Sequence, residues 1–483
     1  MSESVDGEPI PSSWAWVELG DVAESVRNGI YISRPGTTPN GVPILRIGAV
    51  RPMRLDLSDL RYTGMDAEEV EERGGILSPG DLLFTRYNGN PDFVGVCAQV
   101  PQGVGELTYP DKLIRVRLDS RVIDSRFACY AWASESVRKQ VRQHVKTSAG
   151  QVGIAGGSLK RIKLPLPPLA EQCRVVEALE EQLSRIEAGA ATLHQARQRL
   201  EGLRKRVLVW SVPDEAPSGW KVTTVEGAGT IELGRARHPD WHHGPEMRPY
   251  LRVANVFEDR IDTSDVMEMD FSGVWEKYRL EPGDVLLNEG QSPHLVGRPA
   301  LYQGVPKDVA FTNSLLRFKA GVDVLPEWAL LVFRRHLHAK RFMREVRITT
   351  NIAHLSAKRL KKVEFPVPPL DVQKRLVQRS EELLSGIAAM DQQVGIGLRR
   401  AAALKSALLR RAFLGGLVAQ SPDDEPASTL LARIAAERAT QPKPKRTRKA
   451  TVKTPAQRAA EPAAPAPQPT PAPALAVQQE FDL

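Results

Sequence analysis

The sequence contains little cysteine and lacks the short motifs that hold metals or nucleotides in many enzymes. Its 483 residues include three cysteines, and none forms a C-x-x-C pair, so neither a zinc ribbon nor a disulfide framework is indicated. It has no G-x-x-x-x-G-K-[ST] loop for phosphates, no H-E-x-x-H zinc motif, and no [DNS]-P-P-[FWY] stretch of the kind that holds a target amine in amino-methyltransferases. We therefore expect no catalytic residues, no metal and no cofactor on this chain.

Long apolar runs are also absent. No hydrophobic stretch approaches the roughly 20 residues that cross a bilayer, and the polar start of the sequence lacks the apolar core of a signal peptide, so we expect a cytoplasmic protein. Apolar residues still make up 42% of the chain, which is enough for packed cores. The net charge of +8 favours a polyanionic partner, although so small an excess in so long a chain is also common among soluble proteins.

The chain contains a long internal repeat. Several short motifs return in the same order about two hundred residues later, with offsets that drift from 206 to 201. The pairs are PSSWAW at Pro11 and PSGWKV at Pro217, SPGDLLF at Ser78 and EPGDVLL at Glu281, and LKRIKLPLPPL at Leu159 and LKKVEFPVPPL at Leu360. A fixed order with a slow drift indicates a duplication with a few insertions or deletions.

Each copy has the same plan, in which short strand-like runs lead to a proline clamp and then to a long helix. The clamp, P-[LV]-P-P-L-x-x-Q, begins at Pro165 and Pro366, and proline suits the first turn of a helix. Apolar residues three and four apart predict helices over residues 169–210 and 370–414. The expected apolar seam is Val176, Leu179, Leu183, Ile186, Ala190 and Leu193, then Leu200, Leu203 and Val207 after a phase slip at Arg197, and in the second helix Leu383, Ile387, Met390, Val394, Leu398 and Ala401.

The charges of the two predicted helices indicate how they pair. In each helix most acidic residues lie in the first half and most basic residues in the second half. Antiparallel pairing would set acidic halves against basic halves, whereas parallel pairing would set like charges together, so antiparallel pairing is favoured. The same pattern also compensates the helix dipoles, which is the simpler alternative explanation.

Together these features resemble the specificity subunit (HsdS) family of type I restriction–modification systems. The resemblance covers residues 11–418 and rests on the start of the first copy at Trp14, the twin clamps and the two G-D-[LV]-L strands. It implies an α+β fold with two target recognition domains joined by two long antiparallel coiled-coil helices in a pseudo-twofold repeat. The implied segments are a disordered N-terminus (1–10), a recognition domain (11–163), a spacer helix (164–212), a second recognition domain (213–364), a second spacer helix (365–418) and a basic, Pro/Ala-rich disordered tail (419–483).

The resemblance also implies a function. Each recognition domain would read one half of an asymmetric, split site in double-stranded DNA, while the helices would set the spacing and dock two methyltransferase subunits. Motor–nuclease subunits would join through the methyltransferase core, and these partner subunits would bind S-adenosylmethionine, ATP and Mg. The chain itself would be non-catalytic. A self-contained DNA-binding nuclease or methyltransferase with an unrecognised active site is the alternative that the sequence leaves open.

Three kinds of stretch concentrate side chains that can contact DNA. Base edges are read by Arg or Lys, by Asn or Gln and by acidic groups, and hydroxyls and amides also suit the phosphate backbone. The candidates that follow the G-D strands are Arg86, Tyr87, Asn88, Asn90, Asn288, Glu289, Gln291 and Ser292. Those near the start of each copy are Arg27, Asn28, Arg235, Arg237 and His238, and those before the clamps are Thr147, Gln151, Thr349 and Asn351.

Each candidate has a plainer alternative as part of a surface turn, because Asn and Gly favour turns in any protein. Two further arginines, Arg46 and Arg252, lie inside strand-like runs, and we expect partners for them within the fold.

Overall fold

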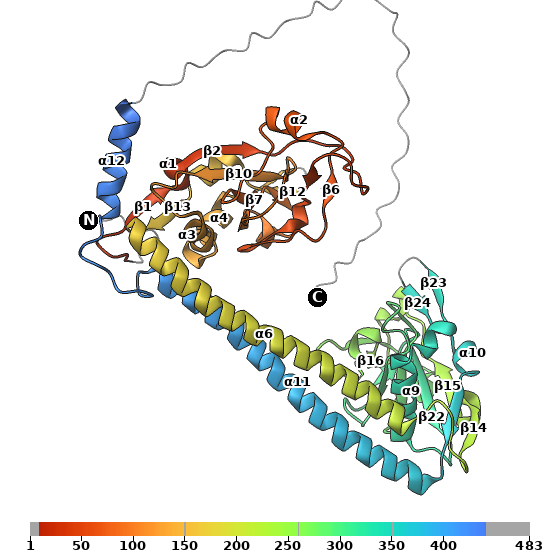
Figure 1. Ribbon diagram of the computed structural model, residues 1–483. Helices are drawn as coiled ribbons and strands as arrows, with labels where there is room; N and C mark the ends of the chain where they lie inside the picture. Colours follow the sequence, from red (N-terminus) through yellow and green to blue (C-terminus); the bar gives the residue numbers. More distant parts are fainter. Residues whose placement is uncertain (1–8, 149–150, 259, 350–351, 441–483) are drawn as a thin grey trace, which may run out of the picture. The chain divides into compact units, whose positions relative to one another are not determined.

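A computed structural model describes residues 9–148, 151–258, 260–349 and 352–440 (Figure 1). Contacts divide the chain into two compact parts, residues 1–431 and 432–483, and the architecture below is that of the first part. Helices and strands are mixed along the chain, as expected for an α+β protein. Among the described residues, no helix is both long and apolar enough to cross a membrane.

The first repeat (residues 11–163) is built on a four-stranded sheet in the order β2–β10–β7–β9. The strands are β2 (Ala23–Asn28), β10 (Leu113–Leu118), β7 (Leu82–Thr85) and β9 (Cys97–Gln99). Helix α3 (Ser125–Trp132) packs on this sheet, with the Trp132 ring edge-on to Phe84 at 4.7 Å between centroids. Further elements are α1 (Leu19–Val22), β3 (Pro43–Ile44), β4 (Val50–Arg51), β5 (Arg54–Leu55), β6 (Arg61–Tyr62), α2 (Ala67–Glu72), α4 (Glu135–His144) and α5 (Gly156–Lys160).

The second repeat (residues 213–364) has the same sheet, in the order β15–β22–β18–β20. The strands are β15 (Gly229–Leu233), β22 (Leu315–Ala320), β18 (Val285–Asn288) and β20 (Pro299–Leu301). Helix α9 (Pro326–His338) covers it, and Phe333 meets Phe318 edge-on at 5.2 Å. Further elements are α7 (Val225–Ala228), β16 (Met247–Leu251), β17 (Met267–Asp270), α8 (Trp275–Tyr278), β21 (Ala310–Phe311) and α10 (Ala357–Leu360).

The aspartate of each G-D-[LV]-L motif closes the turn that precedes its strand. Asp81 accepts the backbone amide of Ser78 at 2.8 Å, and Asp284 accepts that of Glu281 at 2.9 Å. Both carboxylates are buried, and burial raises the pKa of Asp284. These motifs therefore start the central strands and are structural.

The two long helices run over almost the predicted residues, as α6 (Leu169–Ser211) and α11 (Leu370–Phe413). Their contacts are antiparallel, because a residue late in α6 meets one early in α11. Arg197 Nε lies 2.8 Å from Asp391 Oδ1, and the Ser211 hydroxyl lies 2.6 Å from that of Ser380. Nearer the start of α6, Glu187 pairs with Lys405 at 3.0 Å. Figure 1 shows the two helices side by side.

The apolar seam of the helix pair departs from the prediction at two positions. Leu203 is 42% exposed and Met390 is 49% exposed, so neither is a seam residue. On α11, Asp391 takes the place predicted for Met390, because it faces Arg197 of the partner helix. The spacing of apolar residues could not predict that an ion pair, Arg197 with Asp391, occupies the helix contact where the apolar pattern changes phase.

The glutamine that ends each proline clamp explains why the motif occurs twice. Gln172 is fully buried: its side chain accepts the amide of Asp124 at 2.8 Å and donates to the carbonyls of Val122 and Pro167 at 3.0 Å. Gln373 makes the same three bonds, to Leu325, Asp323 and Pro368, at 2.8–2.9 Å. Each glutamine thereby fastens the start of a long helix to the loop before α3 or α9.

A short antiparallel pair closes each repeat beside the clamp, β1 (Ala15–Glu18) with β13 (Lys163–Leu166) and β14 (Lys221–Thr224) with β25 (Glu364–Val367).

A half-buried carboxylate joins the second repeat to α6. Glu258 Oε1 lies 2.8 Å from His338 Nε2 and 3.2 Å from Arg204 Nη2 on the long helix. Burial acts to raise the pKa of Glu258, but the hydrogen bond with His338 and the nearby arginine charge outweigh it and hold this pKa below its usual value. The charged carboxylate thus fixes the loop of the second repeat against the helix.

The prediction of disorder from residue 419 is wrong for the part that the structure describes. Asp424 pairs with Arg174 of α6, and the amide of Ala427 donates to the carbonyl of Ser13 at 3.0 Å. Helix α12 follows (Ala427–Thr440), with Leu430 buried. This segment is rich in good helix formers, and the Pro-rich composition begins only after it. Residues 1–8 and 441–483, including the basic run, lie outside the described residues.

Candidate nucleic-acid interface

In each repeat, two of the three candidate stretches form one small sheet. In the first, β8 (Tyr87–Asn88) pairs with β12 (Gln151–Gly153), which pairs with β11 (Lys146–Ser148). In the second, β19 (Gly290–Gln291) pairs with β24 (Ile352–His354), which pairs with β23 (Arg347–Thr349). The hairpins share their register, since Lys146 faces Gly153 as Arg347 faces His354. In both repeats, therefore, the loop after the G-D strand lies next to the segment that leads into the clamp.

The third stretch reaches the same end of the large sheet in the first repeat. The amide of Arg86 donates to the carbonyl of Lys112 at 2.9 Å, and that of Gly29 donates to Leu113 at 3.2 Å. A Cβ on Gly29 would lie 2.2 Å from the carbonyl oxygen of Tyr109, so only glycine allows the chains to come this close. All three candidate stretches of the first repeat thus meet at one end of the large sheet. We call this end the candidate edge.

The second repeat makes the matching contacts. The amide of Glu289 donates to the carbonyl of Ser314 at 2.9 Å, and that of Gly234 donates to Leu315 at 3.2 Å. A Cβ on Gly234 would lie 2.2 Å from the carbonyl oxygen of Thr312. The same edge is thus built twice, with different side chains on it.

The first repeat presents a cation and amides at this edge. Arg27, Asn28 and Thr147 are exposed, and Arg86 is half-buried with its guanidinium 4.8 Å from the centre of the Tyr87 ring. Asn88 and Asn90 also serve the turn, because their side-chain oxygens accept the amides of Asn90 and Asp92 at 3.0 and 2.9 Å. Arg86 also donates to the carbonyl of Asp111 at 3.3 Å, which limits how its side chain moves.

In the second repeat the corresponding side chains are largely acidic or neutral. Glu289 takes the position of Arg86, and its Oε2 lies 3.2 Å from His354 Nδ1. Gln291 and Ser292 are half-buried, while Arg237 and His238 are exposed. His238 also caps a turn by accepting the amide of Asp240 at 3.4 Å.

Two candidates occupy positions that argue against direct DNA contact. Asn288 is fully buried at the end of β18. Arg235 is 9% exposed, with its guanidinium 4.1 Å from the centre of the Trp241 ring and bonded to the carbonyl of Asp270. Both were chosen as loop residues, but packing from distant segments covers them. The side chains of Gln151 and Thr349 are not described, and Asn351 lies outside the described residues.

Sequence reasoning missed two exposed side chains at the same edge. Lys112 lies beside Arg86, and Asn313 donates its amide to the carbonyl of Arg235 at 2.9 Å. Lys112 is the first residue of the KLIRVRL motif, and Asn313 directly precedes the SLLRFKA motif. Their position in the repeat is the sequence signal that could have identified them. The expectation for Arg46 and Arg252 is confirmed, because each has an intramolecular partner: they form surface ion pairs with Asp59 and Asp265.

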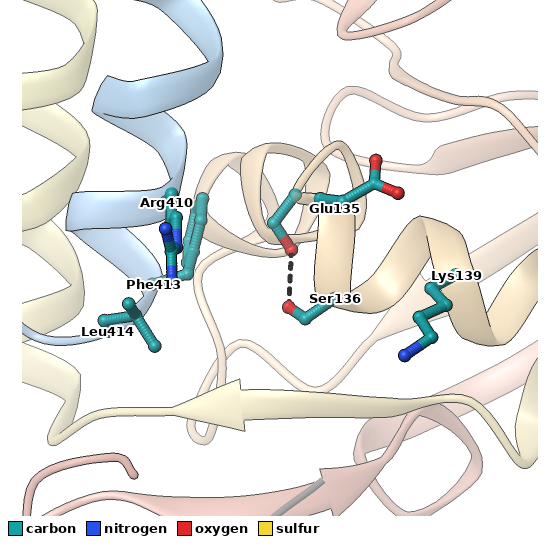
Figure 2. Close-up of a pocket in the computed structure, with 7 residues that line it drawn as sticks. Glu135, Ser136, Lys139, Arg410, Phe413 and Leu414 are labelled. Carbon is teal, nitrogen blue, oxygen red and sulfur yellow. Dashed lines mark hydrogen bonds between the residues drawn. The ribbon is translucent and has the colours of Figure 1, made fainter. Parts of the chain in front are cut away.

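A separate cavity of about 370 Å³ lies at the N-terminal end of α4, whereas the candidate edge follows the C-terminal end of that helix. Figure 2 shows Arg410 and Phe413 of α11, with Leu414 directly after that helix, on one side and residues of α4 on the other. The Phe413 ring packs edge-on against Phe127 at 5.4 Å. The cavity therefore belongs to the joint between α11 and the first repeat. Within the described part of the chain, no group of three or more His, Cys, Asp or Glu residues is placed to hold a metal ion.

Comparisons with known proteins agree with this architecture. The type I restriction enzyme EcoKI specificity subunit of Escherichia coli (strain K12) is 34% identical over 215 residues, which are 44% of this chain and 46% of that protein, so the match spans less than half of the relative. The StySPI specificity subunit of Salmonella potsdam is 24% identical over 457 residues, covering 89% of this chain and 96% of that protein. No protein-family model matches the chain.

A chain from a solved structure on complex assembly and conformational transition of the type I R-M system shares the fold. It superposes with a TM-score of 0.64 at 17% identity and covers 84% of this chain and 99% of its own length. The duplicated architecture, the twin clamps and these matches lead to one conclusion. In sequence and in fold, the chain is similar to type I restriction enzyme specificity subunits, HsdS.

Proposed function

We propose that this chain is the DNA sequence-specificity subunit of a type I restriction–modification complex, in which each repeat reads one half of a split, asymmetric site. The observation that carries the proposal is the edge built twice on the same scaffold with different side chains. Arg86 of the first repeat corresponds to Glu289 of the second, and Asn88 corresponds to Gln291. The first pair sets a guanidinium, which only donates hydrogen bonds, against a carboxylate, which only accepts them, whereas the second pair keeps the same amide chemistry. The exchange of Arg for Glu means that the two half-sites should differ in sequence.

The proposed division of labour follows from the residues at each edge. Exposed Arg27, Lys112 and Arg237 suit contacts with phosphates, which position the protein, whereas Arg86 and Gln291 suit base edges. The antiparallel pair α6–α11 would hold the two target recognition domains at a set spacing and dock two methyltransferase subunits. The chain is the non-catalytic member of the complex; S-adenosylmethionine, ATP and Mg would act on the methyltransferase and motor–nuclease subunits.

Exchanging one repeat tests the two-reader proposal. Residues 11–163 would be replaced by the first recognition domain of another family member, with both clamps retained. One half of the methylated sequence should change and the other should stay the same, because each repeat has its own sheet and its own clamp. Sequencing of methylated sites in a host that carries the system gives the answer. A change in both halves would contradict the proposal.

Replacing Arg86 by alanine tests the first edge. If its guanidinium reads a guanine, discrimination between the specific site and a scrambled duplex should fall by about 1–3 kcal/mol at fixed salt. If it meets a phosphate, affinity for both duplexes should fall together. Arg121, which pairs with Asp119 beyond the far end of β10, provides a control for loss of a paired cation away from this loop. An Arg86 variant that binds both duplexes normally would remove this loop from the interface.

A further inference from the structure

The hairpins that precede the two clamps, β11–β12 and β23–β24, differ in the polarity of their side chains. Their shared register places Ile348 where the first repeat has Thr147, and Ile352 where it has Gln151. Ile348 is 56% exposed and Ile352 is 49% exposed. Of all the isoleucines in the described residues, only these two are exposed, so their position is unusual for this chain.

The two isoleucines lie on opposite faces of the ribbon formed by β23 and β24. Ile348 faces Ala353 across the hairpin and Thr349 faces Ile352, and neighbouring positions on a strand point to opposite sides. Strand β23 is the edge of its sheet, which has the order β19–β24–β23. An edge strand with exposed apolar side chains favours association with other molecules. Exposure of these apolar side chains to water is unfavourable, and a binding partner that covers them would offset this free-energy cost.

The surroundings of this hairpin point to DNA as that partner. Arg344 and Arg347 are exposed immediately before Ile348. Strand β24 pairs with β19, so the hairpin is continuous with the edge that carries Gln291. A two-stranded ribbon fits the major groove of B-form DNA, where the C5-methyl group of thymine is the apolar group that base edges present.

We propose that strands β23 and β24 of this hairpin lie in the major groove and that Ile348 and Ile352 contact thymine methyl groups in the half-site read by the second repeat. This inference rests on the function proposed above. Arg344 and Arg347 contact the flanking phosphates. The first hairpin has Thr147 in place of Ile348, and this exposed hydroxyl reads a hydrogen-bonding group instead. The two repeats therefore differ in the kind of contact they make as well as in the bases they select.

Methyl deletion in the DNA tests this contact directly. The full-length chain, reconstituted with its methyltransferase subunits, would be titrated with duplexes that carry its methylated site. Each thymine of the second half-site would be replaced by deoxyuridine, which removes the methyl group and keeps the base pairing. Wild-type affinity should fall about fourfold for each contacted methyl, as expected for the loss of one buried apolar carbon.

The protein side of the experiment uses Ile348→Thr and Ile352→Gln, which install the residues of the first hairpin. Each variant should bind the normal duplex several-fold more weakly and lose its response to deoxyuridine at one thymine. Both positions are exposed, so thermal unfolding should not change. Deoxyuridine in the first half-site is the matched control and should have no effect.

The outcomes separate the two proposals. Sequence-specific binding that ignores deoxyuridine in the second half-site would overturn the thymine contact and leave the specificity function standing. The same holds if both variants keep the full response to deoxyuridine, because the methyl groups would then be contacted by another part of the chain. Wild-type complex that binds specific and scrambled duplexes equally would overturn both proposals.

Discussion

Lengthening both long helices by four residues should move the two half-sites apart without changing either of them. The insertions would follow Ala190 in α6 and Ala401 in α11, which line the same groove of the helix pair. Four residues add about 6 Å and slightly more than one helical turn, so the apolar seam stays nearly in phase. Because DNA rises about 3.4 Å per base pair, the non-specific gap should grow by one or two base pairs.

The size of the effect makes this experiment decisive. Methylation at the original site should fall below detection, and methylation at the lengthened site should replace it. An insertion in α6 alone is the control, because it shifts Arg197 away from Asp391 and Ser211 away from Ser380 and should abolish activity. An unchanged gap in a folded and active double variant would show that the helices do not set the spacing.

Replacing the clamp glutamine Gln373 by leucine should lower the free energy of unfolding by about 3–5 kcal/mol. Leucine fills a similar volume but leaves the amide of Leu325 and the carbonyls of Asp323 and Pro368 without their partner. An unsatisfied buried polar group costs about 1–3 kcal/mol, and three are created together. The free energy would be measured by urea denaturation.

Two further variants complete that experiment. Gln378 lies on the same helix but is exposed, so Gln378→Leu should change stability by less than about 0.5 kcal/mol. Gln172→Leu should reproduce the loss in the first repeat, where the same three bonds are broken. If Gln373→Leu were no more costly than Gln378→Leu, the clamp would not depend on its glutamine.

The long helices were the most predictable part of the fold. Proline clamps mark where they begin, and apolar residues three and four apart follow the helix for ten turns or more, so local signals suffice. The seam failed at Met390 because the ion pair of Arg197 with Asp391 takes that contact position, and hydrophobic spacing carries no information about such pairs.

The candidate interface was only partly predictable. Loop composition identified the stretches that meet at each edge, because Asn, Gly and Arg gather there for both turn formation and binding. It could not show that Asp270 and Phe271 contact the guanidinium of Arg235 or that Asn288 ends its strand inside the core, since both depend on chain segments that meet only after folding. The helix Ala427–Thr440 was missed because its composition was read together with the Pro-rich residues that follow it.

The twin clamps have a consequence for how such proteins can diversify. Both glutamines bind backbone groups only, so the joint between a recognition domain and its helix does not depend on which side chains surround it. A genetic crossover inside either PPL-x-x-Q motif would therefore exchange one repeat and rebuild an identical joint. New pairings of repeats, and with them the proposed pairs of half-sites, can arise in one recombination event, with no compensating mutation in the helices.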